Sequence, residues 1–290
     1  MRPNGSLKEG RRVTPAEQQI GTVFARMHHY LGQLSKDRKA ENVHRFRTNS
    51  RRVEALVADL APEGRNKRKL LKLLSKLRKK AGRVRDLDVQ IAFLKELKFP
   101  DRQSHRAQLL QALVEEQARR SKKLGKHFDR ERIRQLRKRL ERIEPHLALN
   151  GIDPLRLAIK GLPQPGAMPL SEKTLHGYRI AAKHARYVAE LALDSPRAET
   201  FIAELKQAQD EIGQWHDMLK LTERAQELFG GIRDSALVSM LQNITRARFK
   251  RAGMALVTAL KAISELDQTP QRPRKETSDA EVQRAQTAAA

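Results

Sequence analysis

Apolar side chains recur along this chain at intervals of three and four residues, the spacing of one face of an α-helix. The pattern predicts helices at residues 37–60, 64–97, 101–125 and 129–147. An earlier helix is indicated by Thr14-Pro15-Ala16-Glu17, which has a capping threonine, a proline at the first helical position and a glutamate three residues on. No stretch alternates like a strand. The predicted fold class is therefore all-α.

A proline- and glycine-rich stretch divides the chain into two halves. Five prolines and three glycines lie between Pro145 and Pro169. Helical spacing resumes at Ser171. Ser195-Pro196 has the same signal for a helix start as Thr14-Pro15, a capping residue followed by a proline. We expect a first helical bundle, a linker and a second helical bundle, between a flexible N-terminus and a neutral, polar, disordered tail. The predicted segments are 1–13, 14–147, 148–170, 171–266 and 267–290.

Two short motifs recur at nearly one offset. The pattern His44-x-x-Arg47-x-x-x-Arg51 matches His176-x-x-Arg179-x-x-x-Lys183 after 132 residues, and Gly82-x-x-x-Asp86 matches Gly213-x-x-x-Asp217 after 131 residues. This recurrence indicates a duplication followed by divergence. We therefore predict two pseudo-symmetric antiparallel helical bundles.

The chain is strongly basic, and its excess charge lies mainly in the first half. The formal net charge is +25 over 290 residues. Residues 1–150 contain 39 Lys and Arg against 17 Asp and Glu, whereas residues 151–290 contain 20 against 17. A protein with this charge attracts polyanions.

Cationic residues are also arranged in stripes along single helix faces. Residues spaced i, i+3, i+7 and i+10 stay within one quadrant of a helix. Two stripes have this spacing: His44, Arg47 and Arg51 in the first half, and His176, Arg179, Lys183 and Arg186 in the second. A third stripe has spacings of 4, 3, 4, 3 and 4: Arg65, Lys69, Lys72, Lys76, Lys79 and Arg83. Repulsion within such a stripe costs helix stability, which a bound anion would offset; a solvated basic face is the alternative.

The composition favours a phosphate chain without bases as the partner. Arg and Lys both suit phosphate oxygens. The eight Phe, three Tyr and one Trp are not interleaved with the stripes, as they would be in a binder of single-stranded nucleic acid. Inorganic polyphosphate therefore fits better than RNA. Weak, sequence-independent contact with the nucleic-acid backbone remains an open alternative.

Several other classes of protein lack support in the sequence. There is no cysteine, which excludes disulfides and thiolate chemistry. No metal-ligand motif, P-loop or nucleophile elbow is present, so we expect no cofactor, no metal and no catalysis. Asp86 and Asp217 are expected to pair with arginine.

The sequence also predicts a protein without a membrane segment. The longest uncharged apolar run, from Met254 to Leu260, is far shorter than the roughly 20 residues of a membrane span. The opening MRPNGSLKEGRR lacks the apolar core of a secretion signal. We expect a cytoplasmic location and no membrane partner.

Four stretches of this sequence resemble the CHAD family, named for its conserved histidines in an α-helical domain. They contain His44-Arg-Phe-Arg47, Gly82-Arg-Val-Arg85-Asp86, Leu175-His176-Gly-Tyr-Arg179 and Ile212-Gly213-Gln-Trp-His-Asp217. The resemblance spans roughly residues 15–265. It implies two helical bundles that face each other across a basic groove or channel holding inorganic polyphosphate, and association with polyphosphate granules.

The resemblance carries phosphate contact onto matching positions of both halves. These are His44, Arg47, Arg51 and Arg52, and His176, Arg179, Lys183 and Arg186. Two positions depart from the family pattern, because Glu54 replaces a usual arginine and His216 stands where asparagine is common. The groove is therefore expected to be narrower or less cationic near Glu54. Some relatives carry a fused CYTH domain that acts on phosphorylated substrates, and we expect no such module here. A phosphohydrolase or polyphosphate-dependent kinase is thus only an alternative.

Overall fold

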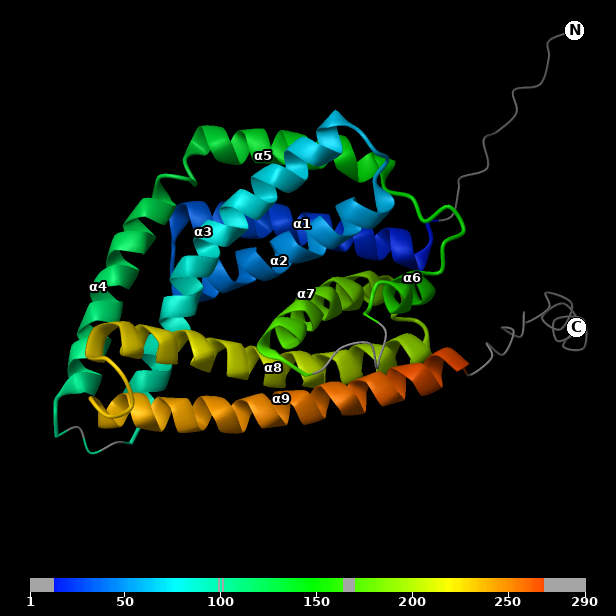
Figure 1. Cartoon of the computed structure of the whole chain (residues 1–290). Coiled ribbons are helices and arrows are strands. Elements are labelled where there is room, and N and C mark those ends of the chain that lie inside the picture. The colour runs from blue at the N-terminus through cyan, green and yellow to red at the C-terminus, as the bar shows by residue number, and fades with distance from the viewer. Residues whose placement is uncertain (1–12, 99, 101, 164–169, 269–290) are drawn as a thin grey trace, which may run out of the picture.

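The computed structural model describes residues 13–98, 100, 102–163 and 170–268. Within these residues the chain forms α-helices and short 3-10 helices without strands, which confirms the all-α fold class (Figure 1). None of the described helices is long and apolar enough to cross a lipid bilayer. The helices are α1 (Pro15–Lys36), α2 (Ala40–Leu60), α3 (Arg65–Glu96), α4 (His105–Gly125), α5 (Arg130–Ile143), α6 (Pro154–Lys160), α7 (Glu172–Ala189), α8 (Pro196–Phe229) and α9 (Ala236–Gln268), with 3-10 turns η1 (Glu144–His146) and η2 (Glu190–Ala192). Residues 1–12 and 269–290, which include most of the two expected flexible ends, lie outside the described residues.

Local sequence signals explain where several helices begin. At α1, the Glu17 amide donates to the Thr14 hydroxyl over 3.2 Å, and the Thr14 amide donates to the Glu17 carboxylate over 2.9 Å. This is the reciprocal capping predicted from the sequence. The stretch expected to be a linker, 148–170, contains α6, because Asp153 caps the amide of Leu155 over 2.9 Å and Pro154 occupies the first helical turn.

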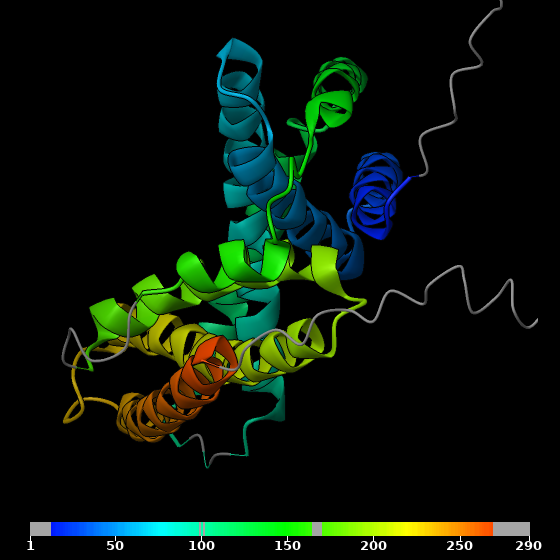
Figure 2. The ribbon, with the colours of Figure 1, turned by 90° about the vertical axis from the view of Figure 1, so that its right-hand side faces the viewer.

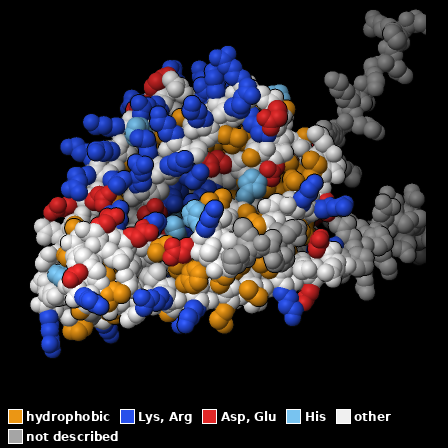
Figure 3. Space-filling view, viewed as in Figure 1, with side chains coloured by type: hydrophobic (Ala, Val, Ile, Leu, Met, Phe, Trp, Pro, Cys, Tyr) orange, Lys and Arg blue, Asp and Glu red, His pale blue; other side chains and the backbone are white. Residues whose placement is uncertain are grey.

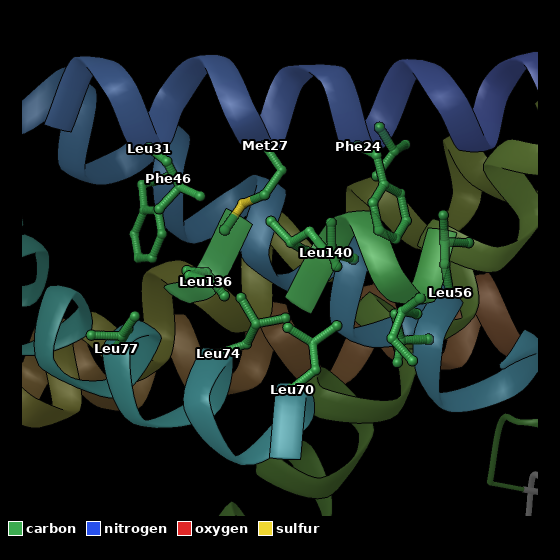
Figure 4. Packing of buried hydrophobic residues seen from close by; sticks show 14 of the residues in the cluster. Phe24, Met27, Leu31, Phe46, Leu56, Leu70, Leu74, Leu77, Leu136 and Leu140 are labelled. Carbon is green, nitrogen blue, oxygen red and sulfur yellow. The ribbon is translucent and has the colours of Figure 1, made fainter. Parts of the chain in front are cut away.

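The first hydrophobic core lies between α1, α2, the N-terminal half of α3, and α5. Figure 4 shows α1 side chains pointing toward those of α3 and α5. Residues at helical spacing fill this space and have almost no exposed surface: Phe24, Met27, Leu31, Phe46, Leu56, Leu70, Leu74, Leu136 and Leu140. Removing any of these side chains would open a cavity, and a buried leucine truncated to alanine costs roughly 2–5 kcal/mol.

A second core lies between α6, α7, α8 and α9. Trp215 of α8 is its largest side chain and is 1% exposed. The Trp215 ring meets the ring of Phe249 from α9 edge-on, with 5.7 Å between centroids. Leu155 and Ala158 of α6 belong to this core. The short helix in the expected linker is therefore part of the second bundle.

A third core joins the two bundles. The C-terminal half of α3 contributes Leu87 and Leu94, α4 contributes Leu109, and α8 and α9 contribute Met218 and Leu241. Figures 1 and 2 both show α3 extending out of the first bundle to lie beside α8. Because α3 and α8 each take part in two cores, apolar packing fixes the position of one bundle against the other.

The order of helices recurs along the chain. Ala40 and Glu172 begin α2 and α7 and are 132 positions apart, while the starts of α3 and α8, and of α4 and α9, are each 131 positions apart. The starts of α4 and α9 also meet, with His105 Nδ1 2.8 Å from the Ser235 hydroxyl. These spacings agree with the two motif offsets and support the inferred duplication. The pseudo-twofold relation of the two bundles stays a prediction.

Candidate functional site

A cavity of about 490 Å³ opens where α2, α3, α7 and α8 meet, and we call it the cationic cavity. Figure 3 shows Lys and Arg side chains gathered on the upper part of this face of the molecule and in the hollow at its centre. Six Lys and Arg side chains line the cavity against three Asp. Its lining comprises His44, Arg47, Thr48, Arg51, Arg85, Asp86, Val89, Arg179, Lys183, Arg186, Tyr187, Gln209, Asp210, Gly213, Gln214 and Asp217.

The fold brings the two repeated basic stripes together in this cavity. His44, Arg47 and Arg51 come from α2, and Arg179, Lys183 and Arg186 come from α7. These six residues were chosen from their helical spacing in segments more than 120 positions apart. Their convergence follows from the packing of α2 against α7.

The helices α3 and α8 supply the acidic groups of the cavity. Arg47 Nη1 donates to Asp86 Oδ1 over 3.2 Å and to the carbonyl of Gly82 over 3.5 Å. This ion pair confirms that Asp86 pairs with an arginine. In the described part of the chain, Asp217 has no carboxylate–cation contact within 4 Å, so the pairing expected for it is absent, although it faces the same cavity as Arg179.

Several basic groups in the cavity have no hydrogen-bond acceptor, although Asp86, Asp210 and Asp217 lie in the same lining. Among the described residues, neither Arg51 nor Lys183 has a hydrogen-bond or ion-pair partner. The Nε atoms of Arg47, Arg179 and Arg186 are also buried without an acceptor. A buried charge that lacks a partner is costly, and a bound anion would remove that cost.

Burial lowers the pKa of the central cations. Burial, together with the neighbouring charge of Arg179, lowers the pKa of the Lys183 ammonium to about 6. Burial, reinforced by Arg47, lowers the pKa of Arg51 to about 10. The pKa of Arg179 is likewise lowered, mainly by burial. At neutral pH Lys183 is therefore mostly uncharged in the unliganded cavity, whereas Arg51 and Arg179 stay charged in surroundings that stabilise charge poorly. A bound anion would favour the charged form of all three side chains.

Two histidines at the edge of the site have lowered pKa values. Burial lowers the pKa of His44, and burial with the charge of Arg179 lowers that of His216 to about 3. The rings of His176 and His216 lie 5.2 Å apart between centroids. His176 is exposed and is not part of the cavity lining, unlike the other members of its stripe. A neutral imidazole can still donate a hydrogen bond to an anion.

A second cavity of about 460 Å³ adjoins the first, and we call it the mixed cavity. The two cavities share a wall made of Arg51, Arg179, Lys183 and Tyr187. The residues that line only the mixed cavity are more varied in chemistry: Glu54, Ala55, Ala58, Leu71, Ser75, Arg78, Lys79, Ile180 and His184.

Glu54 lies in this mixed cavity. The Arg78 Nε donates to Glu54 Oε2 over 2.7 Å, whereas Glu54 Oε1 is buried without a hydrogen-bond partner. Burial raises the pKa of the Glu54 carboxyl. The carboxylate offsets the charge of Arg78, so the site is less cationic on this side, as expected from the sequence.

Arg52 lies outside both cavities. Its Nε donates to Glu190 Oε2 over 2.7 Å and its Nη2 donates to Glu190 Oε1 over 3.2 Å. Its guanidinium carbon also lies 5.2 Å from the centre of the Tyr187 ring. This residue ties α2 to the turn after α7 and is not among the residues that line either cavity.

The long basic stripe of α3 lies on the outside of the molecule. All of its members are exposed, as their spacing predicted, and Lys79 alone among them lines the mixed cavity. The others lie outside the two cavities: Arg65, Lys69, Lys72, Lys76 and Arg83. Arg85, which the sequence reasoning did not select, does line the cationic cavity. Its position next to Asp86 in a recurring motif was the available signal.

No metal-binding group emerges among the residues that the structure describes. No three His, Asp or Glu side chains are gathered there as metal ligands would be. The polar groups that converge in the cationic cavity are mainly donors, and such groups hold anions.

The chain thus belongs to the class of all-α proteins in which two helical bundles enclose a cationic cavity. Residues 18–226 match the family model of the CHAD domain, and the chain is a member of that family, which is associated with polyphosphate-related proteins. No curated protein sequence matches the chain.

Two solved structures share the fold. PptA from Streptomyces chartreusis aligns with a TM-score of 0.62 at 13% identity, covering 85% of this chain and 98% of PptA. The CHAD domain from the plant Ricinus communis aligns with a TM-score of 0.61 at 16% identity, covering 92% of this chain and 98% of that domain. At these identities the similarity defines the fold.

Proposed function

We propose that this protein binds inorganic polyphosphate, without catalysis, in the cationic cavity. The observation that carries the proposal is the convergence of Arg51, Arg179 and Lys183 from two helices in a cavity where basic side chains outnumber acidic ones and where, among the described residues, none of the three makes an ion pair within 4 Å. Phosphate oxygens would accept hydrogen bonds from these groups. Such charge-assisted bonds are about twice as strong as neutral ones.

The size and position of the cavity favour a narrow anion. A chain of phosphates has no bulky side groups, so successive phosphates can reach cations on both α2 and α7. A cavity of about 490 Å³ is too small to admit a nucleic-acid duplex, which would reach only exposed cations. The α3 stripe offers such exposed cations, and weak contact of this stripe with a nucleic-acid backbone is the second candidate.

The exposed stripe also suits long phosphate chains. A polymer held in the cavity can extend along a surface that carries further positive charge, such as Lys69, Lys72 and Lys76. Binding to one long chain through several weak sites increases the overall affinity. We extend the proposal to association with polyphosphate granules, where many such chains are concentrated.

A matched pair of variants tests the site. The double change Arg179→Ala and Lys183→Ala should weaken binding of long-chain polyphosphate at least tenfold, measured by calorimetry at two salt concentrations. The control, Lys206→Ala with Lys261→Ala, removes two basic side chains from exposed positions outside the cavities. Helicity by circular dichroism should be equal in both variants. Equal affinity of the two variants would refute the assignment of the cavity.

Two further measurements separate the alternatives. Duplex DNA, added at equal phosphate concentration, should fail to displace polyphosphate from the wild-type protein. Incubation with polyphosphate, magnesium and a nucleoside diphosphate should release no phosphate and form no triphosphate. Displacement would favour the nucleic-acid alternative, and turnover would favour an enzyme.

A further inference from the structure

The two cavities differ in the chemistry of their walls although they share four residues. The cationic cavity is lined almost entirely by charged and polar side chains. The residues confined to the mixed cavity include four apolar side chains, Ala55, Ala58, Leu71 and Ile180. One ligand that occupied both cavities would need a charged part and an uncharged part.

The cations confined to the mixed cavity are poorly suited to extend a phosphate chain. Arg78 is paired with Glu54 over 2.7 Å, and a phosphate placed here would meet the Glu54 carboxylate. His184 is occupied by Asp59, with 2.9 Å between Nε2 and Oδ2. Lys79 is the remaining cation among the side chains that line only this cavity, and it is exposed.

The same cavity offers apolar surface and hydrogen-bonding groups. Ile180 is 59% exposed although it is a large aliphatic residue, so a ligand that covered it would gain from the hydrophobic effect. The hydroxyl of Ser75 and the carboxylate of Glu54 can accept hydrogen bonds from hydroxyl or amino groups. A volume of about 460 Å³ lies within the range of cavities that hold small molecules.

We propose that the mixed cavity holds the nucleoside of a nucleoside polyphosphate whose phosphates lie in the cationic cavity. This inference rests on the proposed function, because Arg51, Arg179 and Lys183 in the shared wall would hold the phosphates nearest to the nucleoside. The base would cover Ile180 and Leu71, and its amino group or the ribose hydroxyls would donate to the acceptors described above. A prenyl diphosphate would use the apolar side chains alone.

Calorimetry with two ligands of equal phosphate number provides the test. Adenosine 5′-tetraphosphate carries less charge than inorganic tetrapolyphosphate, so electrostatics alone makes the nucleotide the weaker ligand. The proposal requires the opposite order, with the nucleotide bound roughly tenfold more tightly through the apolar contact. Both titrations use the full chain at the same salt concentration without divalent cations.

Two exposed positions provide matched variants. Ile180→Asn should remove the advantage of the nucleotide and leave the affinity for inorganic tetrapolyphosphate unchanged. Val257→Asn, on α9 at 65% exposure and outside both cavities, should change neither affinity. Retained nucleotide preference in the Ile180→Asn variant would overturn the placement of the base.

The outcomes distinguish this inference from the function on which it rests. If inorganic tetrapolyphosphate binds as tightly as the nucleotide or more tightly, only the inference about the mixed cavity is overturned. The inference is also overturned if geranyl diphosphate binds more tightly than pyrophosphate while the nucleotide binds no more tightly than inorganic tetrapolyphosphate. If neither tetraphosphate binds, the proposed function and the inference both fail.

Discussion

Replacing Lys183 by methionine should stabilise the unliganded protein while weakening its binding of phosphate. The pKa of Lys183 is about 6 in the folded chain, against an ordinary value of 10.5. Between these values the unfolded chain binds a proton that the folded chain lacks. The contribution of Lys183 to stability therefore decreases as the pH falls from about 10.5 to about 6, and is constant below that.

The size of this effect follows from the shift in pKa. At about 1.36 kcal/mol per pKa unit, the shift lowers the free energy of unfolding by at most about 6 kcal/mol. About 5 kcal/mol of this loss applies at pH 7. Water that enters the open cavity reduces this penalty. We expect the methionine variant to gain about 1–3 kcal/mol at pH 7, since methionine has a similar size and the unfolded variant no longer gains free energy by protonating this side chain.

Urea unfolding at pH 7 and pH 9.5 measures the effect. The variant should be more stable than the wild type at pH 7, and its advantage should shrink at pH 9.5, where less than about a third of the wild-type penalty at pH 7 remains. Lys206→Met serves as the control, because Lys206 is exposed and lies outside both cavities. An advantage that is absent at pH 7, or equal at both pH values, would refute the reasoning.

Three other predictions concern binding and packing. A bound phosphate chain restores the charge of Lys183, so polyphosphate affinity should fall by up to about tenfold per pH unit above pH 6. Calorimetry in two buffers should detect the uptake of a proton on binding. If the methionine variant takes up a proton as well, Lys183 is not the group that binds it. Arg52→Ala should lower the free energy of unfolding by about 1–3 kcal/mol, because the largely buried Glu190 loses both hydrogen bonds from Arg52 and keeps only its longer ion pair with Arg186, but polyphosphate affinity should change less than about twofold; a large loss of affinity would return Arg52 to the site. Lys67→Ala should cost about 1–3 kcal/mol in thermal or urea unfolding, because the buried ammonium donates to two carbonyls at the C-terminal end of α2; a neutral result would contradict that capping role.

The sequence predicts the helices of this fold well because their caps and apolar spacing are local. Thr14 and Ser195 mark the starts of α1 and α8 as expected. The helix α6 was missed because Pro154 was interpreted as part of a linker, whereas proline also suits the first turn of a helix. The third core was missed because periodicity shows which face of α3 is apolar without showing that its two halves contact different partners.

Much of the candidate site follows from spacing along two helices, but not all of it. Arg47 and Arg51 lie a turn apart and face one cavity, whereas Arg52 is rotated by about 100° from Arg51 and meets Glu190 instead. That partner is 138 positions away, so only the fold reveals it. Arg85 also lines the cavity, and only the fold reveals this, because its position depends on how α3 packs against α2.

The sharing of α3 and α8 between cores has a consequence for how such a chain can evolve. The inferred duplication suggests that each half once existed as a unit, yet Leu87 and Leu94 of one half and Met218 and Leu241 of the other now belong to a single core that both halves build. Recombination at the junction between the halves would expose these residues to water. The two halves are therefore inherited together, and a change in one that alters the packing of α3 against α8 selects for a compensating change in the other.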